Sequence, residues 1–305
     1  MNYAVEINNL SKSFGALNAV DQFNLKIPEN SIFGIIGPNG AGKTTLFSLL
    51  AGFLQADQGE TLILGSSKVA DFFGKMSILP QDARFQSNIP ILEQLMFFLQ
   101  LGGYSRRKAK EEIERILEIV DFTHLLEKTP ATLSHGQYKR LSLAQAFLGN
   151  PRLIILDEPT TGLDYKSAKS VREYIKKLKK EATVIVSSHD MKEMRDLCDS
   201  YALIQDGKMI KTGDLTALAK ERPRFRLELA RPCSTTDLDN LKKLEGVESV
   251  QVQDELLIFL NLETTPMDQA DLSSLLLRAI VTAGIGVSQF TYINPLEDLY
   301  ARTNV

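Results

Sequence analysis

The sequence contains little cysteine and no pattern that would use it. Of its 305 residues only two are cysteine, Cys198 and Cys233. Their spacing is not that of a zinc site, and they do not form the framework of a small disulfide-stabilised protein. A reducing compartment such as the cytoplasm is therefore the simplest expectation, and the chain is long enough for two ordinary domains with a substantial core.

Long apolar runs are missing as well. A helix that crosses a bilayer needs about 20 mainly apolar residues. The nearest candidate, Ile89–Leu101, is interrupted by Glu93 and Gln94. If this protein acts at a membrane, we expect another chain to supply the membrane-spanning part.

An excess of charge of one sign is also absent. The formal net charge is −3, so nothing indicates a surface for nucleic acid, and no nucleic-acid partner is expected. The basic run Arg106–Lys110 is followed at once by Glu111 and Glu112. That alternation is typical of a solvated helix face with pairs four residues apart. There are no internal repeats or low-complexity tracts.

What the sequence does contain is a phosphate-binding loop. Gly37–Thr45 reads GPNGAGKTT and fits G-x-x-x-x-G-K-[ST] at every specified position. The apolar stretch Ile32–Ile36 precedes it and a helical pattern to about Ala51 follows, which is the strand–loop–helix setting that the motif needs. Glycines let backbone N–H groups turn toward phosphate oxygens, Lys43 adds a positive charge, and Thr44 can bind Mg²⁺.

The rest of the first two-thirds alternates strands and helices. Residues 89–150 are mostly helical in pattern, with Lys108–Val120 the clearest amphipathic repeat. Continuous apolar runs predict buried parallel strands, and Asp206-Gly207 predicts a hairpin. The predicted strands are Ala4–Ile7, Phe23–Ile27, Ile32–Ile36, Thr61–Leu64, Ser77–Leu79, Leu153–Leu156, Thr183–Val186, Tyr201–Gln205 and Lys208–Lys211, with a charged helix at Ser167–Lys180.

The pattern changes after about Ala219, and Arg222-Pro223 is typical of a linker. The segments that follow predict the order β-α-β-β-α-β of a small ferredoxin-like α+β domain. They are Phe225–Leu229, Thr236–Leu244, Val247–Val252, Leu256–Leu262, Asp268–Ala283 and Val287–Ile293, followed by a last short helix, Leu296–Arg302. We therefore expect domains at 1–219, with a helical part at about 82–150, and at 220–305.

Two acids follow one of the buried strands. Leu153–Leu156 is apolar and leads directly into Asp157 and Glu158. Asp157 is expected to hold Mg²⁺, and Glu158 can accept a proton from an attacking water as a general base. A strand that merely ends in surface acids is common, but it is improbable beside a phosphate-binding loop.

Between these motifs lies Leu133-Ser134-His135-Gly136-Gln137. Here the chain resembles the ATP-binding subunits of ABC transporters, whose signature is LSGGQ. The family's motifs occur in order from Phe14 to His189, about two-thirds of the chain. One departure is His135, which takes the place of the first glycine. Ser134-x-x-Gln137 also fits a helix capping box, and both interpretations can hold.

The resemblance implies a role for residues at each matching motif. Gln81 is the glutamine that reaches Mg²⁺ and the attacking water, and His189 is the switch histidine that contacts the γ-phosphate. Phe14 is the aromatic that stacks on adenine, although a phenylalanine there could equally be a core residue. The implied catalytic residues are Glu158, His189 and Gln81; the metal-binding residues are Thr44, Gln81 and Asp157; the nucleotide-binding residues are Phe14, Gly37, Asn39, Gly40, Ala41, Gly42, Lys43, Thr44, Thr45, Ser134, Gly136, Gln137 and Asp164.

The resemblance also implies a fold and an activity. The fold is a RecA-like α/β phosphate-loop NTPase core with an antiparallel β subdomain and a helical subdomain. The activity is ATP hydrolysis with Mg²⁺ in a dimer, expected to be a homodimer, in which Ser134–Gln137 of one subunit closes over the γ-phosphate held by the other. The expected partner is a separate permease, on whose cytoplasmic side the chain would sit as a peripheral subunit.

Two other functions stay open. One is an ABC ATPase without a transport role, acting on DNA or ribosomes, although the interval between the loop and the signature has no sustained heptads. The other is an ATP-gated regulator in which residues 220–305 bind a ligand. ATPase activity that depends on a membrane protein would favour transport, and ligand binding to the tail domain would favour regulation.

Two further segments bear on the partner. Pro295–Tyr300 is similar to the ending of ATP-binding subunits that pair with ABC-2-type permeases, many of them exporters. In Ile91–Leu99 the apolar residues wrap more than one helix face, so a single core-facing stripe cannot bury them all. Some of Met96, Phe97 and Phe98 are therefore expected to be exposed beside Gln81, where a permease would dock; burial inside the helical part is the alternative.

Overall fold

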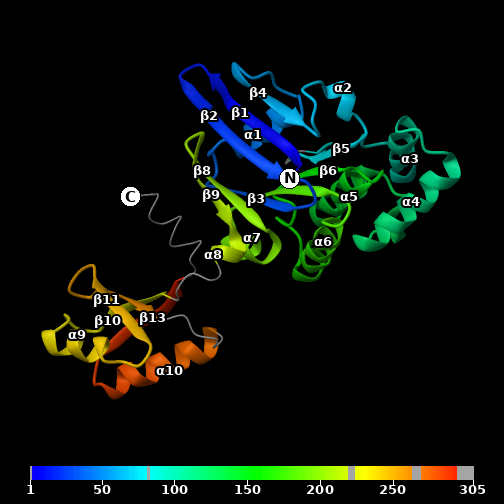
Figure 1. Cartoon of the computed structure of the whole chain (residues 1–305). Helices are drawn as coiled ribbons and strands as arrows, with labels where there is room; N and C mark the ends of the chain where they lie inside the picture. Colours follow the sequence, from blue (N-terminus) through cyan, green and yellow to red (C-terminus); the bar gives the residue numbers. More distant parts are fainter. Residues whose placement is uncertain (1, 81–82, 219–223, 263–268, 294–305) are drawn as a thin grey trace. The chain divides into compact units, whose positions relative to one another are not determined.

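The computed structural model describes residues 2–80, 83–218, 224–262 and 269–293. The chain divides into two compact units, Met1–Asp214 and Leu215–Val305 (Figure 1). The change of pattern in the sequence predicted a division after residue 219, five residues beyond the observed one. The expected tail helix Leu296–Arg302 and the linker residues Arg222 and Pro223 lie outside the described residues.

The first unit is built on a six-stranded sheet with the order β5-β6-β7-β3-β8-β9. Its strands are β3 (Ile32–Ile36), β5 (Met76–Leu79), β6 (Leu153–Asp157), β7 (Thr183–Ser188), β8 (Ser200–Gln205) and β9 (Lys208–Asp214). The first five in the order run parallel and β9 is antiparallel to β8. Every residue of β3, β6 and β7 is buried, as expected of central parallel strands covered on both faces.

A separate three-stranded antiparallel sheet has the order β2-β1-β4. It contains β1 (Tyr3–Phe14), β2 (Leu17–Pro28) and β4 (Gln58–Ile63). Strands β1 and β2 are far longer than the sequence predicted. The parts that the prediction missed, residues 8–14 and 17–22, mix apolar and polar residues without regular alternation of buried and exposed positions. Such residues carry no apolar alternation, so only the ladder that joins the two strands reveals them.

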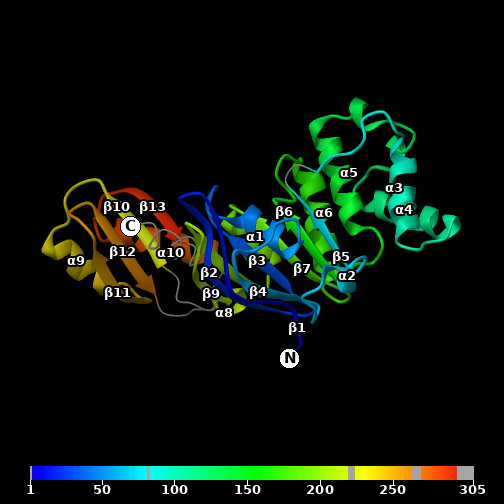
Figure 2. The same cartoon turned by 90° about the horizontal axis from the view of Figure 1, so that it is seen from above.

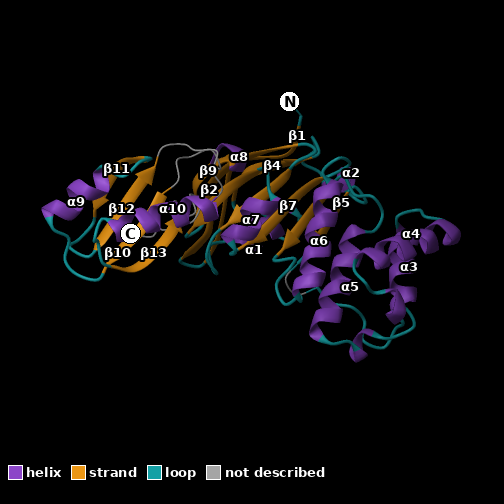
Figure 3. Ribbon diagram, turned by 90° about the horizontal axis from the view of Figure 1, so that it is seen from below, coloured by secondary structure: helices purple, strands orange, loops and turns teal. Residues whose placement is uncertain are grey.

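Helices surround the parallel sheet, and three of them form the predicted helical part. α3, α4 and α5 gather at one end of this unit (Figures 2 and 3). Two 3₁₀ turns lie between α4 and α5, and apolar residues such as Leu95, Ile113 and Leu141 of the three helices are completely buried. The helices of the first unit are α1 (Lys43–Leu50), α2 (Val69–Phe72), α3 (Ile91–Leu101), α4 (Arg106–Ile119), α5 (His135–Phe147), α6 (Tyr165–Leu178) and α7 (Met191–Leu197).

The second unit follows the order that the sequence predicted. After α8 (Leu215–Leu218) come β10 (Arg224–Leu229), α9 (Thr235–Lys242), β11 (Val247–Val252), β12 (Leu257–Leu262), α10 (Gln269–Thr282) and β13 (Val287–Ile293). The four strands pair antiparallel in the order β11-β12-β10-β13, and α9 and α10 lie against the sheet (Figure 1). Leu241, Leu276 and Ile280 from the helices share one core with Phe225 and Leu260.

Among the described helices, none is both long enough and apolar enough to cross a membrane.

Candidate nucleotide-binding site

The candidate residues meet where three parallel strands end. In the register of the sheet, Ile36 of β3 lies beside Ser188 of β7, and Asp157 of β6 lies beside Ser187. The phosphate-binding loop follows β3 directly. The carboxyl ends of parallel strands are the usual place for ligands in such sheets. Segments far apart in the sequence are thus brought to one edge.

The loop has the backbone that its glycines predict. Gly42 has φ +102°, and a Cβ there would fall 2.1 Å from the carbonyl oxygen of Ala19, so only glycine fits. α1 begins at the next residue with no side-chain cap. Its first N–H groups are therefore available to an anion, and the helix dipole favours one.

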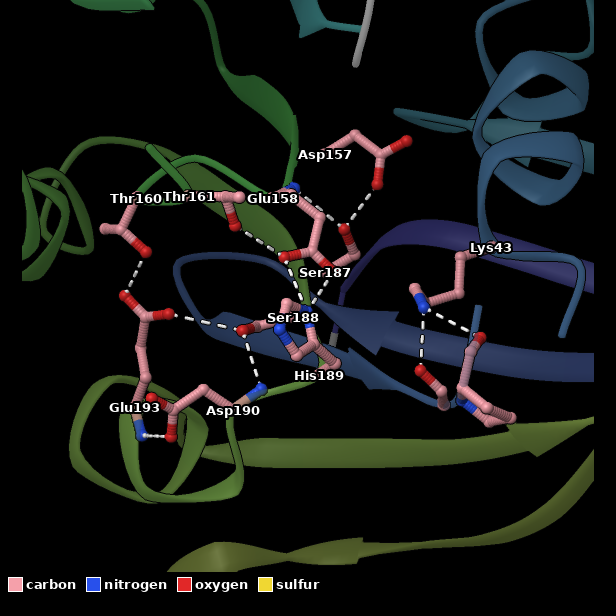
Figure 4. A network of polar contacts seen from close by, with 12 residues as sticks. Lys43, Asp157, Glu158, Thr160, Thr161, Ser187, Ser188, His189, Asp190 and Glu193 are labelled. Atoms are coloured by element: carbon pink, nitrogen blue, oxygen red, sulfur yellow. Dashed lines mark hydrogen bonds and ion pairs between the residues drawn. The ribbon is translucent and has the colours of Figure 1, made fainter. Parts of the chain in front are cut away.

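Lys43 lies inside this loop. Its side chain is 6% exposed, and Nζ donates to the carbonyl oxygens of Gly37 (2.7 Å) and Pro38 (3.0 Å), as Figure 4 shows. Burial lowers the pKa of this ammonium group, against the opposing charges of Glu158 and Asp157. The cation is thus held in the place where the loop would bind phosphates.

Thr44 and Asp157 form a pair that fits a magnesium ion. Oγ1 of Thr44 donates to Oδ2 of Asp157 (2.8 Å), and Ser187 Oγ donates to Oδ1 (2.5 Å). A hydroxyl and one carboxylate are hard oxygen donors, and Mg²⁺ is commonly held by few protein oxygens together with substrate phosphates and water. Within the described residues, no group of three or more His, Cys, Asp or Glu forms a denser metal site. Bound Mg²⁺ would neutralise phosphate charge during hydrolysis.

The carboxylate of Glu158 is fixed from two sides. His189 Nδ1 lies 3.0 and 3.1 Å from its two oxygens, and Thr161 Oγ1 donates to Oε2 (2.8 Å) (Figure 4). Glu158 also has φ +50°, an uncommon conformation for a residue with a side chain, and its N–H donates to Ser187 Oγ. Such local strain is typical of functional positions. The geometry suits a general base held ready for a water molecule.

A second acid organises the segment around His189. Glu193 accepts hydrogen bonds from Thr160 (2.7 Å) and Ser188 (3.2 Å), as Figure 4 shows. It also forms an ion pair with Arg172. Glu193 thereby ties the residues that follow β6 to those that end β7. Thr160 and Ser188 are close in sequence to Glu158 and His189, and Glu193 itself is not among the described residues that line the pocket.

These residues open onto one pocket of about 660 Å³. Phe14, Leu17 and Ala19 line one part, so Phe14 is a pocket residue rather than a core residue, and its ring is 49% exposed. An exposed aromatic face can stack on a base. The other lining residues are Pro38, Asn39, Gly40, Gly42, Lys43, Thr44, Thr45, His135, Lys139, Asp157, Glu158, Thr161 and His189.

The signature segment caps its own helix. Ser134 Oγ accepts from the N–H of Gln137, whose side chain accepts from the N–H of Ser134, so the capping box predicted from sequence is confirmed. Asp164 likewise caps α6, with Oδ1 accepting from Ser167 N (2.9 Å). Among the described residues, Ser134, Gly136, Gln137 and Asp164 do not line the pocket of their own chain.

Gln81 lies outside the described residues. Other residues of the site were not singled out from the sequence. Ser187 and Thr161 hold Asp157 and Glu158, and their only sequence signal is their place beside the motifs. Lys139 follows His135 by one helical turn, which was the signal that could have placed both on one face of α5.

The unusual His135 packs against the segment after Glu158. Its ring lies so close to Gly162 that a Cβ on that glycine would be 2.8 Å from Cε1 of His135. Gly162 has φ +82°, a second position where glycine is required. The imidazole of His135 forms no hydrogen bond with the described residues, so His135 contacts Gly162 by packing alone.

We expect the substitution His135→Gly to leave ATP hydrolysis unchanged or slightly faster, because Ser134 still caps the helix. The cost is about 1 kcal/mol of helix propensity at most, visible in thermal unfolding. His135→Ala, which avoids that cost, is the control. A loss of activity in both variants, with folding intact, would show that the imidazole takes part in the chemistry.

Comparison with known proteins identifies the family of the chain. The family model described as ABC transporter matches residues 20–161. Bacillus subtilis YhcH, an uncharacterized ABC transporter ATP-binding protein, is 32% identical over 84% of this chain and 86% of its own length. Bacillus subtilis YxlF, with the same description, is 30% identical over 98% of both chains, the second unit included. The spermidine/putrescine import ATP-binding protein PotA of Pseudomonas fluorescens is 31% identical over 73% of this chain and 64% of its own.

Solved structures share the fold of the first unit. A dimeric ATP-binding cassette, solved in a post-hydrolysis state with ADP and phosphate, superposes with a TM-score of 0.63 at 24% identity. The match covers 69% of this chain and 98% of that one. The predicted RecA-like phosphate-loop fold is confirmed.

Proposed function

Because the chain belongs to the ATP-binding proteins of ABC transporters, we propose that it drives transport through a separate membrane permease by binding and hydrolysing ATP. The chain is an ATPase of the phosphate-loop class. The observation that carries the proposal is a single pocket in which Lys43, the Thr44–Asp157 pair and the Glu158–His189 pair face the same space. These are the charge, the metal-binding oxygens and the base that phosphoryl transfer to water requires.

The working unit that we propose is a dimer of two such chains. Ser134 is exposed at the N-terminus of α5, and among the described residues Ser134, Gly136 and Gln137 do not line the pocket of their own chain. A helix N-terminus is a natural partner for a phosphate group. In a two-fold dimer, each Ser134–Gln137 segment would close over the γ-phosphate bound by the other chain, and hydrolysis would reopen the pair.

The proposed permease surface lies on α3. Phe97 and Phe98 are 58% and 39% exposed, Met96 is half-buried, and the two rings lie 6.2 Å apart. They line a groove of about 710 Å³ with Arg84, Glu93 and Arg106 among its polar residues. An apolar patch rimmed by charges is typical of an interaction site. The expectation of exposure is confirmed, and docking of the permease there is our proposal.

We also propose that the chain sits on the cytoplasmic side of the membrane and that transport is outward. The support for direction is the similarity of Pro295–Tyr300 to the ending of subunits that pair with ABC-2-type permeases; these residues lie outside the described part of the chain. One relative, PotA, is an import ATP-binding protein, so the proposed direction rests on these tail residues.

We expect Phe97→Glu to separate the subunit from its permease while sparing basal ATPase activity. The new charge would have to be buried in an apolar contact without a partner, which is costly. The measurement is ATP-driven transport, and permease-stimulated ATPase activity, in vesicles that contain the permease that co-purifies with the wild-type chain.

Phe53→Glu is the matched control, because Phe53 is 64% exposed and does not line the groove. The control should behave as the wild type in both assays. Full stimulation and transport with the Phe97 variant would rule out this surface. No ATP-dependent transport by wild-type chain and permease together would rule out the proposed function.

A further inference from the structure

The pocket contains a second lysine that no family motif accounts for. Lys139 lies on α5 one helical turn after His135, and both side chains line the pocket together with Asp157, Glu158 and His189. The helix that begins with the signature segment thus turns one face toward the nucleotide pocket of its own chain.

Lys139 differs from Lys43 in having no partner among the residues that the structure describes. Lys43 donates to two loop carbonyls. The ammonium group of Lys139, although half-buried, forms no hydrogen bond or ion pair with any residue that the structure describes. Burial lowers its pKa, while the charges of Asp157 and Glu158 oppose that change. A partly desolvated cation without a partner is unfavourable, and an anion brought into the pocket would relieve the cost.

The surroundings of Lys139 indicate which part of a nucleotide that anion is. The base-binding part of the pocket is marked by Phe14 and Leu17, and the phosphate-binding part by Lys43 and Thr44. The acids whose charges act on Lys139 are Asp157 and Glu158, the proposed magnesium-binding and water-activating residues. In phosphoryl transfer, both of these groups work at the terminal phosphate.

We propose that Lys139 binds the γ-phosphate of the ATP molecule held by its own subunit. The inference rests on the proposed nucleotide site. It adds a contact made within one chain to the contact expected from the Ser134–Gln137 segment of the second chain. Lys43 would hold the phosphates that ATP and ADP share, whereas Lys139 would hold the phosphate that only ATP has. Lys139 would then let a single subunit distinguish ATP from ADP before it dimerises.

The first test measures the affinity of the dilute, monomeric subunit for Mg²⁺ with ADP or with the β,γ-imido analogue of ATP. We expect Lys139→Gln to weaken analogue binding about tenfold, the value of one charge-assisted hydrogen bond, and to leave ADP binding within about twofold. Lys139→Met is a second neutral variant suited to a half-buried site. Lys139→Arg should keep the preference for the analogue, and Lys176→Gln, on the exposed face of α6, is the surface control.

Two results would overturn the inference. One is an equal loss of affinity for analogue and ADP, which a merely structural role would give. The other is unchanged affinity for both in the neutral variants. Failure of the proposed nucleotide site is distinguishable, because then the wild-type subunit would bind neither nucleotide; failure of the proposed transport function would leave nucleotide binding intact and appear only in the transport assay.

A mixing experiment tests whether the contact lies within one chain. Lys43→Ala subunits, whose own site is inactive, are mixed with Lys139→Gln subunits, so that each mixed dimer has its working loop in the Lys139→Gln chain. We expect this mixture to hydrolyse ATP more slowly than Lys43→Ala mixed with wild type. The double variant Lys43→Ala/Lys139→Gln mixed with wild type should hydrolyse ATP as fast as Lys43→Ala mixed with wild type. If the double-variant mixture is instead slower than the mixture of Lys43→Ala with Lys139→Gln, Lys139 acts on the partner's nucleotide.

Discussion

Replacing Glu158 by glutamine is expected to abolish ATP turnover while ATP still binds. The amide is nearly the same size as the carboxylate, and its oxygen can still accept the hydrogen bond from Thr161, which is 2.8 Å long in the wild type. What it cannot do is take a proton from water. The loss expected for removal of a general base is about 10²- to 10⁴-fold in rate, measured as phosphate release by the purified chain.

The same substitution should trap the closed dimer. Without hydrolysis, ATP remains between the two subunits, and the loss of a negative charge beside the γ-phosphate favours closure further. Size-exclusion chromatography should therefore show a dimer with ATP and a monomer with ADP. Glu173→Gln, an exposed position on α6, is the control and should keep the wild-type rate. Wild-type turnover in the Glu158 variant would mean that another group accepts the proton.

Replacing Lys43 by alanine is expected to weaken binding of ATP and ADP together. The lysine brings its charge to phosphates that both nucleotides carry, and its two hydrogen bonds hold the carbonyls of Gly37 and Pro38 in the loop. Charge-assisted hydrogen bonds contribute about 1.5–3 kcal/mol each, so the dissociation constants should rise by at least about tenfold. Titration of the subunit with each nucleotide measures this directly.

Variants of Lys43 and Lys139 should differ in which nucleotide affinities they lower. Lys43→Ala should lower both affinities, whereas Lys139→Gln should lower only the affinity for the triphosphate. Lys176→Ala, on the exposed face of α6, should lower neither. Unchanged affinity for both nucleotides in the Lys43 variant would place this lysine outside the site.

The sequence by itself determined the elements that carry the motifs. Apolar runs identified β3, β6 and β7, because strands buried on both faces leave an unbroken apolar signal. The phosphate-binding loop could be read from spacing alone, since its glycines are required by the backbone itself, as Gly42 shows. The order of the second unit also followed from local patterns, which are clearest in β10 and β12, where every second residue is buried.

The sequence did not reveal elements with weak local patterns. Helices α2 (Val69–Phe72) and α7 (Met191–Leu197) are too short to show a clear helical period, and both were missed. Residues 8–14 of β1 and 17–22 of β2 were missed because they show no regular apolar alternation, and the pairing between the two strands became visible only in the structure.

Only the tertiary structure decided which side chains meet. The order of strands in the sheet is a long-range property, and it alone brings Asp157 next to Ser187 and Glu158 next to His189. The exposure of Phe14 and Phe97 could not be settled from sequence, because an aromatic residue serves equally well in a core or at a binding surface. The position of Lys139 depends on how α5 packs beside the sheet, since a helical period gives a residue's face but not what that face contacts.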